Sequence, residues 1–151
     1  MDDRQIGVLI IEDEKSYAKP LTKTLEKNNF AVRFENNGRD GLVAALSDHP
    51  DIILLDLMMP DMDGMQVLRT LRKDDWGKNV LIIIMTNIEL EEKNAESLDC
   101  VYLVKSKYSL KQIEELLNET RDIVEYYKKF LKEKYTVKTV VEKLRKRLED
   151  K

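Results

Sequence analysis

Four short apolar runs limit the folds that this chain can adopt. Each run is four to six residues long and almost continuously apolar, which is typical of a strand in a parallel sheet that helices cover on both faces. A weaker run at Ala31–Phe34 alternates apolar and polar residues, as a strand at the edge of a sheet does. The continuous runs are Gly7–Ile11, Ile52–Asp56, Val80–Met85 and Val101–Val104.

Segments with the periodicity of helices separate these strands. Because strand and helix alternate five times along the chain, the sequence predicts an α/β fold with a parallel sheet and right-handed crossovers. Pro20 lies inside the first helical segment, where it removes a backbone hydrogen bond and should kink the helix. The helical segments are Lys15–Asn28, Gly38–Ser47, Met65–Lys73, Glu89–Ser97 and a long stretch from Ser109 onward.

Length and composition bound the class of protein. A chain of 151 residues can bury a sizeable core without disulfides or metals. The first residues lack the basic and then apolar pattern of a secretory signal, and the apolar runs are too short to span a bilayer. The single cysteine, Cys100, excludes an internal disulfide and an all-cysteine zinc site. We therefore expect a cytoplasmic protein with no membrane span.

Polar side chains follow four of the predicted strands. Glu12 and Asp13 follow the first strand, and Asp56 ends the third. Thr86 follows the fourth and Lys105 the fifth. Because ligands of an open α/β sheet bind at the carboxyl ends of its strands, we expect these side chains to lie together. A lone acid after a strand is more often a turn or helix-cap residue, but compatible groups at four strand ends favour a site.

This group of side chains suits phosphoryl chemistry that depends on Mg²⁺. Mg²⁺ prefers oxygen ligands, which the three acids and the backbone carbonyl of Met58 would supply. Asp56 could act as a nucleophile and form an aspartyl phosphate. Lys105 would stabilise the phosphoryl oxygens electrostatically, and Thr86 could hydrogen-bond one of them.

Two segments carry a resemblance to a known family. The segment VLIIEDE at residues 8–14 resembles the acidic-pair segment of the receiver domain of bacterial two-component response regulators. The segment DLMMPDMDG at residues 56–64 resembles the phosphoacceptor segment of that family. The spacing from Asp56 to Thr86 also fits, as does Tyr102 three residues before Lys105. The resemblance covers roughly residues 6–120.

The resemblance implies a fold and a reaction. The fold is the flavodoxin-like, doubly wound arrangement of five parallel strands in the order 2-1-3-4-5, for which a receiver domain is a standard example. The reaction is phosphorylation of Asp56 by a sensor histidine kinase or a phosphotransfer protein, with Glu12 and Asp13 holding Mg²⁺. Such a domain is not an enzyme with foreign substrates, because it catalyses only its own phosphorylation and dephosphorylation.

The resemblance also implies how the signal leaves the site. Thr86 and Lys105 would sense the phosphoryl group, and Tyr102 would be an aromatic switch whose ring turns inward when Thr86 moves. Output would then pass through the face formed by the fourth helix, the fifth strand and the fifth helix, and through the C-terminal extension.

Three features depart from the family pattern. Ser106 follows Lys105 where the family usually has proline, so the loop there should be built differently. Asn87 stands where the residue after Thr86 is usually small. The stretch from Thr86 to Lys105 is about one helical turn shorter than expected, which puts the fourth helix in doubt.

Two other functions share part of this pattern. A phosphohydrolase of the haloacid-dehalogenase kind also uses an Asp nucleophile at a strand end, but it needs a second Asp two residues later, where this chain has Met58. A non-catalytic structural or dimerisation module on a receiver fold would have lost the nucleophile, the lysine or the acidic pair, and all of these are present. The sequence therefore favours a phosphorelay switch.

The chain continues past the last helix that a receiver domain needs. We therefore divide it into a receiver domain at residues 1–121 and a helical extension at residues 122–151. The extension is predicted to be either one long helix or a helical hairpin that breaks near Lys134–Thr136, with Thr136 capping the second helix. Apolar positions with coiled-coil spacing continue along it, at Val124, Tyr127, Phe130, Val137, Val141, Leu144 and Leu148.

The charge and the apolar stripe of the extension suggest its partner. Residues 121–151 carry a net charge of +5, whereas residues 1–120 carry −8. The charges of the extension alternate in sign, which argues against nucleic acid as a partner. A long apolar stripe should not stay in water. Two partners could cover it: the body of the same chain, through a hairpin that folds back, or the same stripe of a second chain. Because the core of the body should be complete without the extension, we favour the second chain, in a homodimer.

Overall fold

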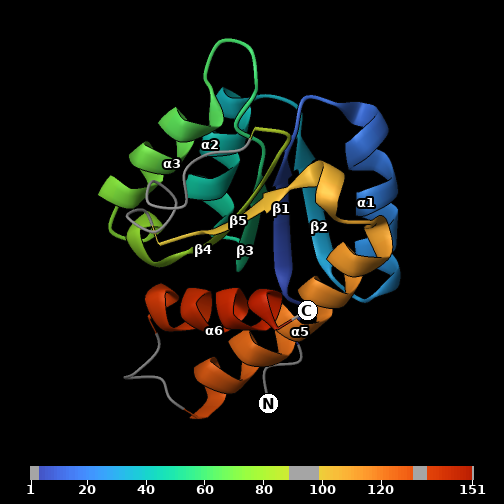
Figure 1. Ribbon diagram of the computed structural model, residues 1–151. Coiled ribbons are helices and arrows are strands. Elements are labelled where there is room, and N and C mark those ends of the chain that lie inside the picture. Colours follow the sequence, from blue (N-terminus) through green and yellow to red (C-terminus); the bar gives the residue numbers. More distant parts are fainter. Residues whose placement is uncertain (1–3, 89–98, 131–135, 151) are drawn as a thin grey trace.

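The computed structural model describes residues 4–88, 99–130 and 136–150 of the chain. A twisted parallel sheet of five strands forms its centre, in the order β2-β1-β3-β4-β5 (Figure 1). This order confirms the flavodoxin-like arrangement that the sequence predicts. The strands are β1 (Gly7–Ile11), β2 (Ala31–Glu35), β3 (Ile52–Leu55), β4 (Leu81–Thr86) and β5 (Val101–Val104).

Helices cover both faces of the sheet. Side chains of α1, α5 and α6 pack against one face, and side chains of α2 and α3 pack against the other. The predicted helix at residues 89–97 lies outside the described residues. The helices are α1 (Lys15–Lys27), α2 (Gly38–Asp48), α3 (Gly64–Lys73), α5 (Leu110–Phe130) and α6 (Val137–Glu149), with short 3-10 turns at Gly77–Asn79 and Lys105–Lys107.

The apolar runs of the sequence become strands because they are buried on both faces. Along β1, Val8 and Ile10 belong to the cluster under α1 and α5, whereas Leu9 and Ile11 belong to the cluster under α2 and α3. Every residue of β3 and β4 is buried. A continuous apolar sequence is what such two-sided burial requires.

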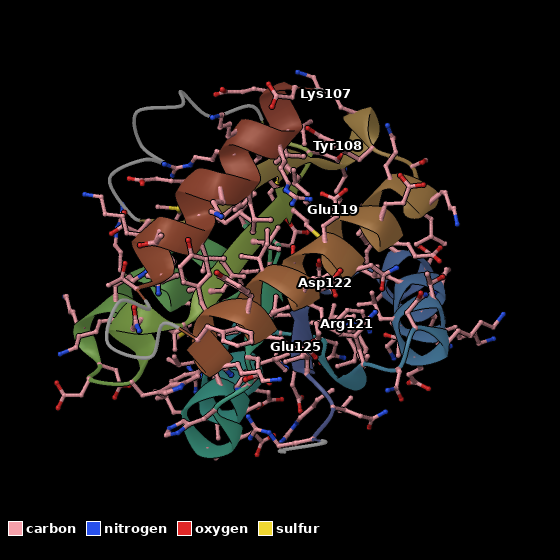
Figure 2. All side chains as sticks on the ribbon, turned by 90° about the horizontal axis from the view of Figure 1, so that it is seen from below. Lys107, Tyr108, Glu119, Arg121, Asp122 and Glu125 are labelled. Atoms are coloured by element: carbon pink, nitrogen blue, oxygen red, sulfur yellow. The ribbon has the colours of Figure 1, made fainter. Side chains whose placement is uncertain are left out.

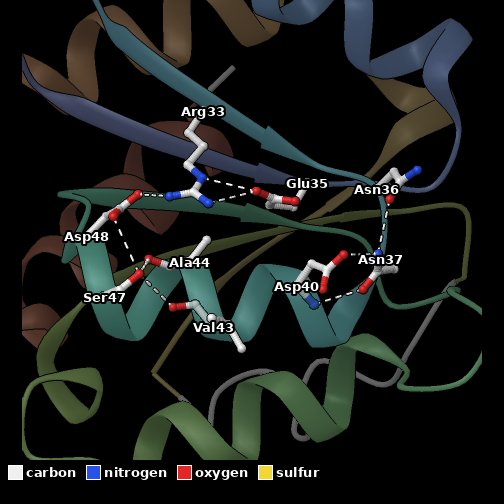
Figure 3. Close-up of polar contacts among 9 residues, drawn as sticks. All are labelled: Arg33, Glu35, Asn36, Asn37, Asp40, Val43, Ala44, Ser47 and Asp48. Carbon is white, nitrogen blue, oxygen red and sulfur yellow. Dashed lines mark hydrogen bonds and ion pairs between the residues drawn. The ribbon is translucent and has the colours of Figure 1, made fainter.

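Local signals fix where the helices begin. Asn37 caps α2 by accepting a hydrogen bond from the backbone N–H of Asp40 (Figure 3). Asp63 forms a capping box with Gln66 at the start of α3. Pro20 lies within α1, and the helix nevertheless extends from Lys15 to Lys27.

The edge strand β2 carries polar residues, as its alternating sequence predicts. Figure 3 shows that Arg33 of β2 pairs with Glu35 on the same strand and with Asp48 at the end of α2. These pairs are largely exposed, so each contributes little to stability. They do place charge along an unpaired edge, which discourages another strand from adding to it.

The C-terminal extension folds back on the body as a helical hairpin. Helix α5 runs through residue 121 without a break and continues to Phe130. Thr136 then caps α6, because its side-chain oxygen accepts a hydrogen bond from the backbone N–H of Thr139. Viewed from below, α6 lies beside the second half of α5 and across the end of the sheet (Figures 1 and 2). The predicted boundary between 121 and 122 therefore falls inside a continuous helix.

Helix α6 crosses the amino-terminal ends of β4 and β5. The backbone N–H of Val137 donates to Oδ1 of Asn79, just before β4, at 2.8 Å. Arg145 donates to the carbonyl of Cys100, just before β5, at 2.9 Å. The apolar side of α6 enters the same cluster as β4, β5 and α5. The buried residues of this helix are Val137, Val140, Val141 and Leu144.

The reason given for a homodimer is therefore wrong. It assumed that the core of the body is complete without the extension, and so favoured a second chain over a fold-back onto the same chain. The structure buries Val124, Tyr127 and Leu144 against the body instead. They pack in the apolar cluster on the face of the sheet that α1 and α5 cover, and α6 completes this cluster. Dimerisation through these helices is an untested prediction that has lost its physical argument.

The hairpin predicts how stability responds to a change in α6. Leu144→Ala should lower the free energy of unfolding by about 2–5 kcal/mol, because it removes a fully buried side chain. Lys146→Ala, on the exposed side of the same helix, should change it by less than about 0.5 kcal/mol. Urea unfolding at two protein concentrations measures both effects. A loss for Leu144→Ala as small as that for Lys146→Ala would contradict the fold-back, and a midpoint that rises with protein concentration would show a dimer.

Candidate functional site

Three acidic residues meet at the carboxyl-terminal edge of the sheet. Glu12 and Asp13 directly follow β1, and Asp56 directly follows the neighbouring strand β3. Carboxylate oxygens of the three side chains lie within 4.8 Å of one another. Glu12 and Asp56 are buried, whereas Asp13 is exposed, so the group is open to solvent on one side.

Backbone hydrogen bonds extend past the strands and hold these residues in place. The N–H of Asp56 donates to the carbonyl of Ile11 at 3.0 Å, and the N–H of Glu12 donates to the carbonyl of Glu35 at 3.1 Å. The carboxylate of Asp56 accepts a hydrogen bond from the N–H of Met58 at 3.2 Å. The backbone N–H of Met58 therefore lies beside the carboxylate, whereas the role of its carbonyl as a metal ligand stays a prediction.

Lys105 brings a positive charge to the acids. It follows β5, and its Nζ lies 2.6 Å from Oε2 of Glu12, 3.1 Å from Oδ2 of Asp56 and 3.9 Å from Oε2 of Glu14. Burial by itself would lower the pKa of this amine, but its hydrogen bond to Glu12 and the charges of Glu12 and Asp56 raise the pKa above its ordinary value. The amine is therefore protonated and pairs with both buried carboxylates.

The electrostatics of Glu12 show how crowded the site is. The pKa of Glu12 is raised to about 7, chiefly by burial and also by the charge of Asp56, although Lys105 and the backbone N–H of Glu14 act to lower it. Burial raises the pKa of Glu12 by more than the ammonium group of Lys105 lowers it. When all three acids are ionised, the site carries three negative charges against the single positive charge of Lys105.

The loop after Asp56 depends on a glycine. A Cβ on Gly64 would lie 2.2 Å from the carbonyl oxygen of Asp56 and 2.7 Å from Cα of Leu57, which is closer than any side chain can approach. The N–H of Gly64 also donates to the carbonyl of Leu57 at 3.0 Å. Only glycine lets α3 begin this close to the nucleophile candidate, which explains its place in the segment.

The predicted sensing residues are linked through one neighbour. Thr86 is the fully buried last residue of β4, and its hydroxyl accepts a hydrogen bond from the N–H of Ile88 at 3.4 Å. The hydroxyl of Tyr102, on β5, donates to the carbonyl of Ile88. Thr86 and Tyr102 therefore contact the same short segment, which gives a physical route between them.

The structure describes two of the three positions that depart from the family pattern. Lys105, Ser106 and Lys107 form a 3-10 turn, and the described residues contain no cis peptide bond. Asn87 is exposed and Cys100 is buried among apolar side chains. The shortened stretch before Asp99 falls in residues that the structure does not describe.

The cluster has the chemistry of a site for a hard divalent cation. The side chains of Glu12, Asp13 and Asp56 offer carboxylate oxygens from two adjacent strand ends, close enough to share one ion. Mg²⁺ takes such oxygen ligands and keeps some of its water. The exposed side at Asp13 leaves room for that water, and an added cation would offset the excess negative charge.

One residue at the site was not anticipated from the sequence. Tyr17 of α1 places its ring under Lys105, with Nζ 4.4 Å from the ring centroid. Tyr17 lies four residues after Asp13, about one helical turn beyond the acidic pair, and this spacing could have predicted that its side chain lies near the site. Its contact with a lysine far along the chain could come only from the fold.

The fold and the site together define a class of protein. It is a doubly wound α/β protein with a buried lysine and three acids at the carboxyl ends of its strands. The sequence profile of the response regulator receiver domain family matches residues 8–118. The chain therefore belongs to this family, whose members are the receiver domains of two-component systems.

Individual relatives agree with the family assignment. The transcriptional regulatory protein CusR of Escherichia coli is 37% identical over 99 residues, which are 65% of this chain and 44% of that protein. The response regulator ArlR of Staphylococcus aureus is 38% identical over 120 residues, which are 78% of this chain and 52% of that protein. The chain thus spans about half the length of such relatives.

Solved structures show the same fold. The chemotaxis protein CheY4 of Vibrio cholerae matches with a TM-score of 0.69 at 24% identity, over 77% of this chain and 98% of that one. The receiver domain of a Francisella response regulator matches with a TM-score of 0.67 at 27% identity, over 76% of this chain and 95% of that one. None of the described helices is long and apolar enough to cross a membrane.

The raised pKa of Glu12 predicts how stability depends on pH without Mg²⁺. The folded protein holds a proton on Glu12 up to about pH 7, whereas the ordinary value is 4.5. Relative to Glu12→Gln, wild-type stability should therefore fall as the pH rises from about 4.5 to about 7, by up to ~3 kcal/mol. Glu14→Gln, at an exposed side chain, is the matched control, because the difference in stability between wild type and Glu14→Gln should not change in this way with pH. Urea unfolding at several pH values tests this, and a constant difference between wild type and Glu12→Gln would contradict it.

Proposed function

We propose that this chain is a phosphorelay switch that accepts a phosphoryl group on Asp56. The donor would be a sensor histidine kinase or a phosphotransfer protein of a two-component system. The observation that carries the proposal is the position of Lys105, whose ammonium pairs with Glu12 and Asp56 within the acidic cluster. A buried lysine beside the buried carboxylate of Asp56, in a cluster that is open to solvent at Asp13, suits transfer of an anion to Asp56.

The transfer requires little covalent chemistry from the protein. A carboxylate oxygen of Asp56 attacks phosphorus, the bond from phosphorus to the donor nitrogen breaks, and the nitrogen keeps the electron pair of that bond. Glu12, Asp13, Asp56 and the carbonyl of Met58 would hold Mg²⁺ in this state. When bound, the ion neutralises part of the charge of the phosphoryl group.

Lys105 stabilises the phosphoryl group on the side of β5. Its amine is protonated, and it lies within reach of an oxygen on Asp56. As the carboxylate of Asp56 becomes an acyl phosphate, it gives up its own charge, and the ammonium can donate to a phosphoryl oxygen instead. The hydroxyl of Thr86 would donate to a second phosphoryl oxygen. To do so the hydroxyl would move away from the N–H of Ile88, from which it now accepts a hydrogen bond.

The same contacts provide an output route. Movement of Thr86 changes the Ile88 segment, to which the hydroxyl of Tyr102 is bound. Tyr102 lies on β5, and the carbonyl of Cys100 at the start of this strand accepts a hydrogen bond from Arg145 of α6. A change at the site can therefore reach the C-terminal hairpin through one strand, in addition to the face of β5 and α5.

The nucleophile assignment predicts a labelling result. Acetyl phosphate or phosphoramidate with Mg²⁺ should add one phosphoryl group to the wild-type chain, and Asp56→Asn should abolish the addition. Asp61→Asn is the matched control, because Asp61 is an exposed acid in the same loop and its positive φ suits asparagine. Intact-protein mass spectrometry measures both. A label on Asp56→Asn, or on another residue of the wild type, would refute the assignment.

The metal assignment predicts a change in thermal stability. Mg²⁺ binds the folded site and should raise the melting temperature, with about 2.7 kcal/mol of stabilisation at a concentration 100 times its dissociation constant. Asp13→Asn should weaken the effect by removing an exposed ligand, while Asp61→Asn should leave it intact. Differential scanning calorimetry with and without millimolar Mg²⁺ measures the shift. An unchanged melting temperature of the wild type would argue against the site.

A further inference from the structure

Lys105 has one neighbour in the site that is not an acid. The ring of Tyr17 lies 4.4 Å from its Nζ, measured to the ring centroid. A cation within about 6 Å of the face of an aromatic ring is attracted by the negative charge of that face. The ammonium is thus held by carboxylates on one side and by the ring on another.

The carboxylates are the partners that the proposed reaction engages. Asp56 becomes an acyl phosphate, and Glu12 would ligate the metal ion. Each event takes a carboxylate oxygen away from the ammonium, whereas the ring of Tyr17 takes part in neither. The ring therefore persists while the charge of the site changes, as does the longer contact of the ammonium with the exposed carboxylate of Glu14, at 3.9 Å.

Packing holds the ring in this position. Tyr17 is partly buried and packs against the apolar cluster formed by α1, α5 and the sheet. Its hydroxyl is buried and has no hydrogen-bond partner among the described residues, so no polar contact there orients the ring. Burial raises the pKa of Tyr17 to about 12, and the nearby acids raise it as well. The phenol is therefore neutral at physiological pH, and the ring keeps an attractive face.

We propose that Tyr17 is a positioning residue for phosphoryl transfer, whose ring keeps the ammonium of Lys105 beside Asp56 when Glu12 and Asp56 release it. The inference rests on the function proposed above. The inference assigns different roles to the two parts of the side chain: the ring positions the ammonium, and the hydroxyl does not.

Two substitutions test this separation. Tyr17→Phe keeps the ring, and its phosphorylation rate with phosphoramidate and Mg²⁺ should stay close to that of the wild type. Tyr17→Leu removes the ring and should lower the maximal rate roughly tenfold, with little change in the donor concentration that gives half of it. Tyr17→Met is a second variant without a ring, in case Tyr17→Leu does not fold. A rate for Tyr17→Phe as low as that of the ring-free variants would overturn the proposal.

The role should depend on Lys105. In a Lys105→Ala background, the proposal predicts that Tyr17→Leu causes no further loss of rate, because there is no ammonium left to position. A full additional loss in that background would show that Tyr17 acts independently, which contradicts the proposal.

The contact itself can be measured without any phosphoryl donor or metal. Ring currents should shift the NMR signals of the Lys105 Cε protons in the wild type and in Tyr17→Phe, and the shift should be lost in Tyr17→Leu. Signals that do not respond to loss of the ring would overturn the Tyr17 proposal alone. If the wild type shows the shift but is never labelled on Asp56, the proposed function fails, and the role of Tyr17 in transfer fails with it.

Discussion

The paired ammonium of Lys105 is the interaction on which the site depends. Glu12 and Asp56 are both buried, and without a cation between them their charges would oppose folding. Lys105 follows β5, the last strand along the chain, yet its Nζ lies within 3.1 Å of both carboxylates. The parallel order of the strands makes this possible, because it brings the carboxyl ends of β1, β3, β4 and β5 to one edge. The single positive charge of Lys105 does not neutralise three ionised carboxylates, so a further cation would lower the electrostatic repulsion at the site.

The opposite edge of the sheet has a different character. There the second half of α5 and the whole of α6 close the apolar cluster, and polar contacts attach them to the starts of the strands. Lys128 of α5 pairs with Asp51, just before β3. The hairpin is thus part of the core of the receiver domain. Since β5 runs from the hairpin to Lys105, one strand connects the two edges.

The sequence predicted the sheet and most of the site because both follow from short-range patterns. The limits of β1 and β5 agree with the apolar runs, and Glu12, Asp13, Asp56 and Lys105 meet where their strand ends require. The partner of the α6 stripe could not be predicted this way, because an apolar stripe shows that a surface is covered and not which chain covers it. The contact between Tyr17 and Lys105 was missed for a related reason, since it joins two elements that are distant in the sequence.

The central claim is that Lys105 and the three acids form a receptor for a phosphoryl group on Asp56. A crystal structure of the chain with Mg²⁺ and beryllium fluoride, which mimics a phosphoryl group, tests it most directly. The account predicts the mimic on a carboxylate oxygen of Asp56, the metal ion on Glu12, Asp13 and Asp56, and Lys105 donating to a fluoride. A mimic bound elsewhere, or a Lys105 that still pairs with Glu12 beside an empty Asp56, would contradict it.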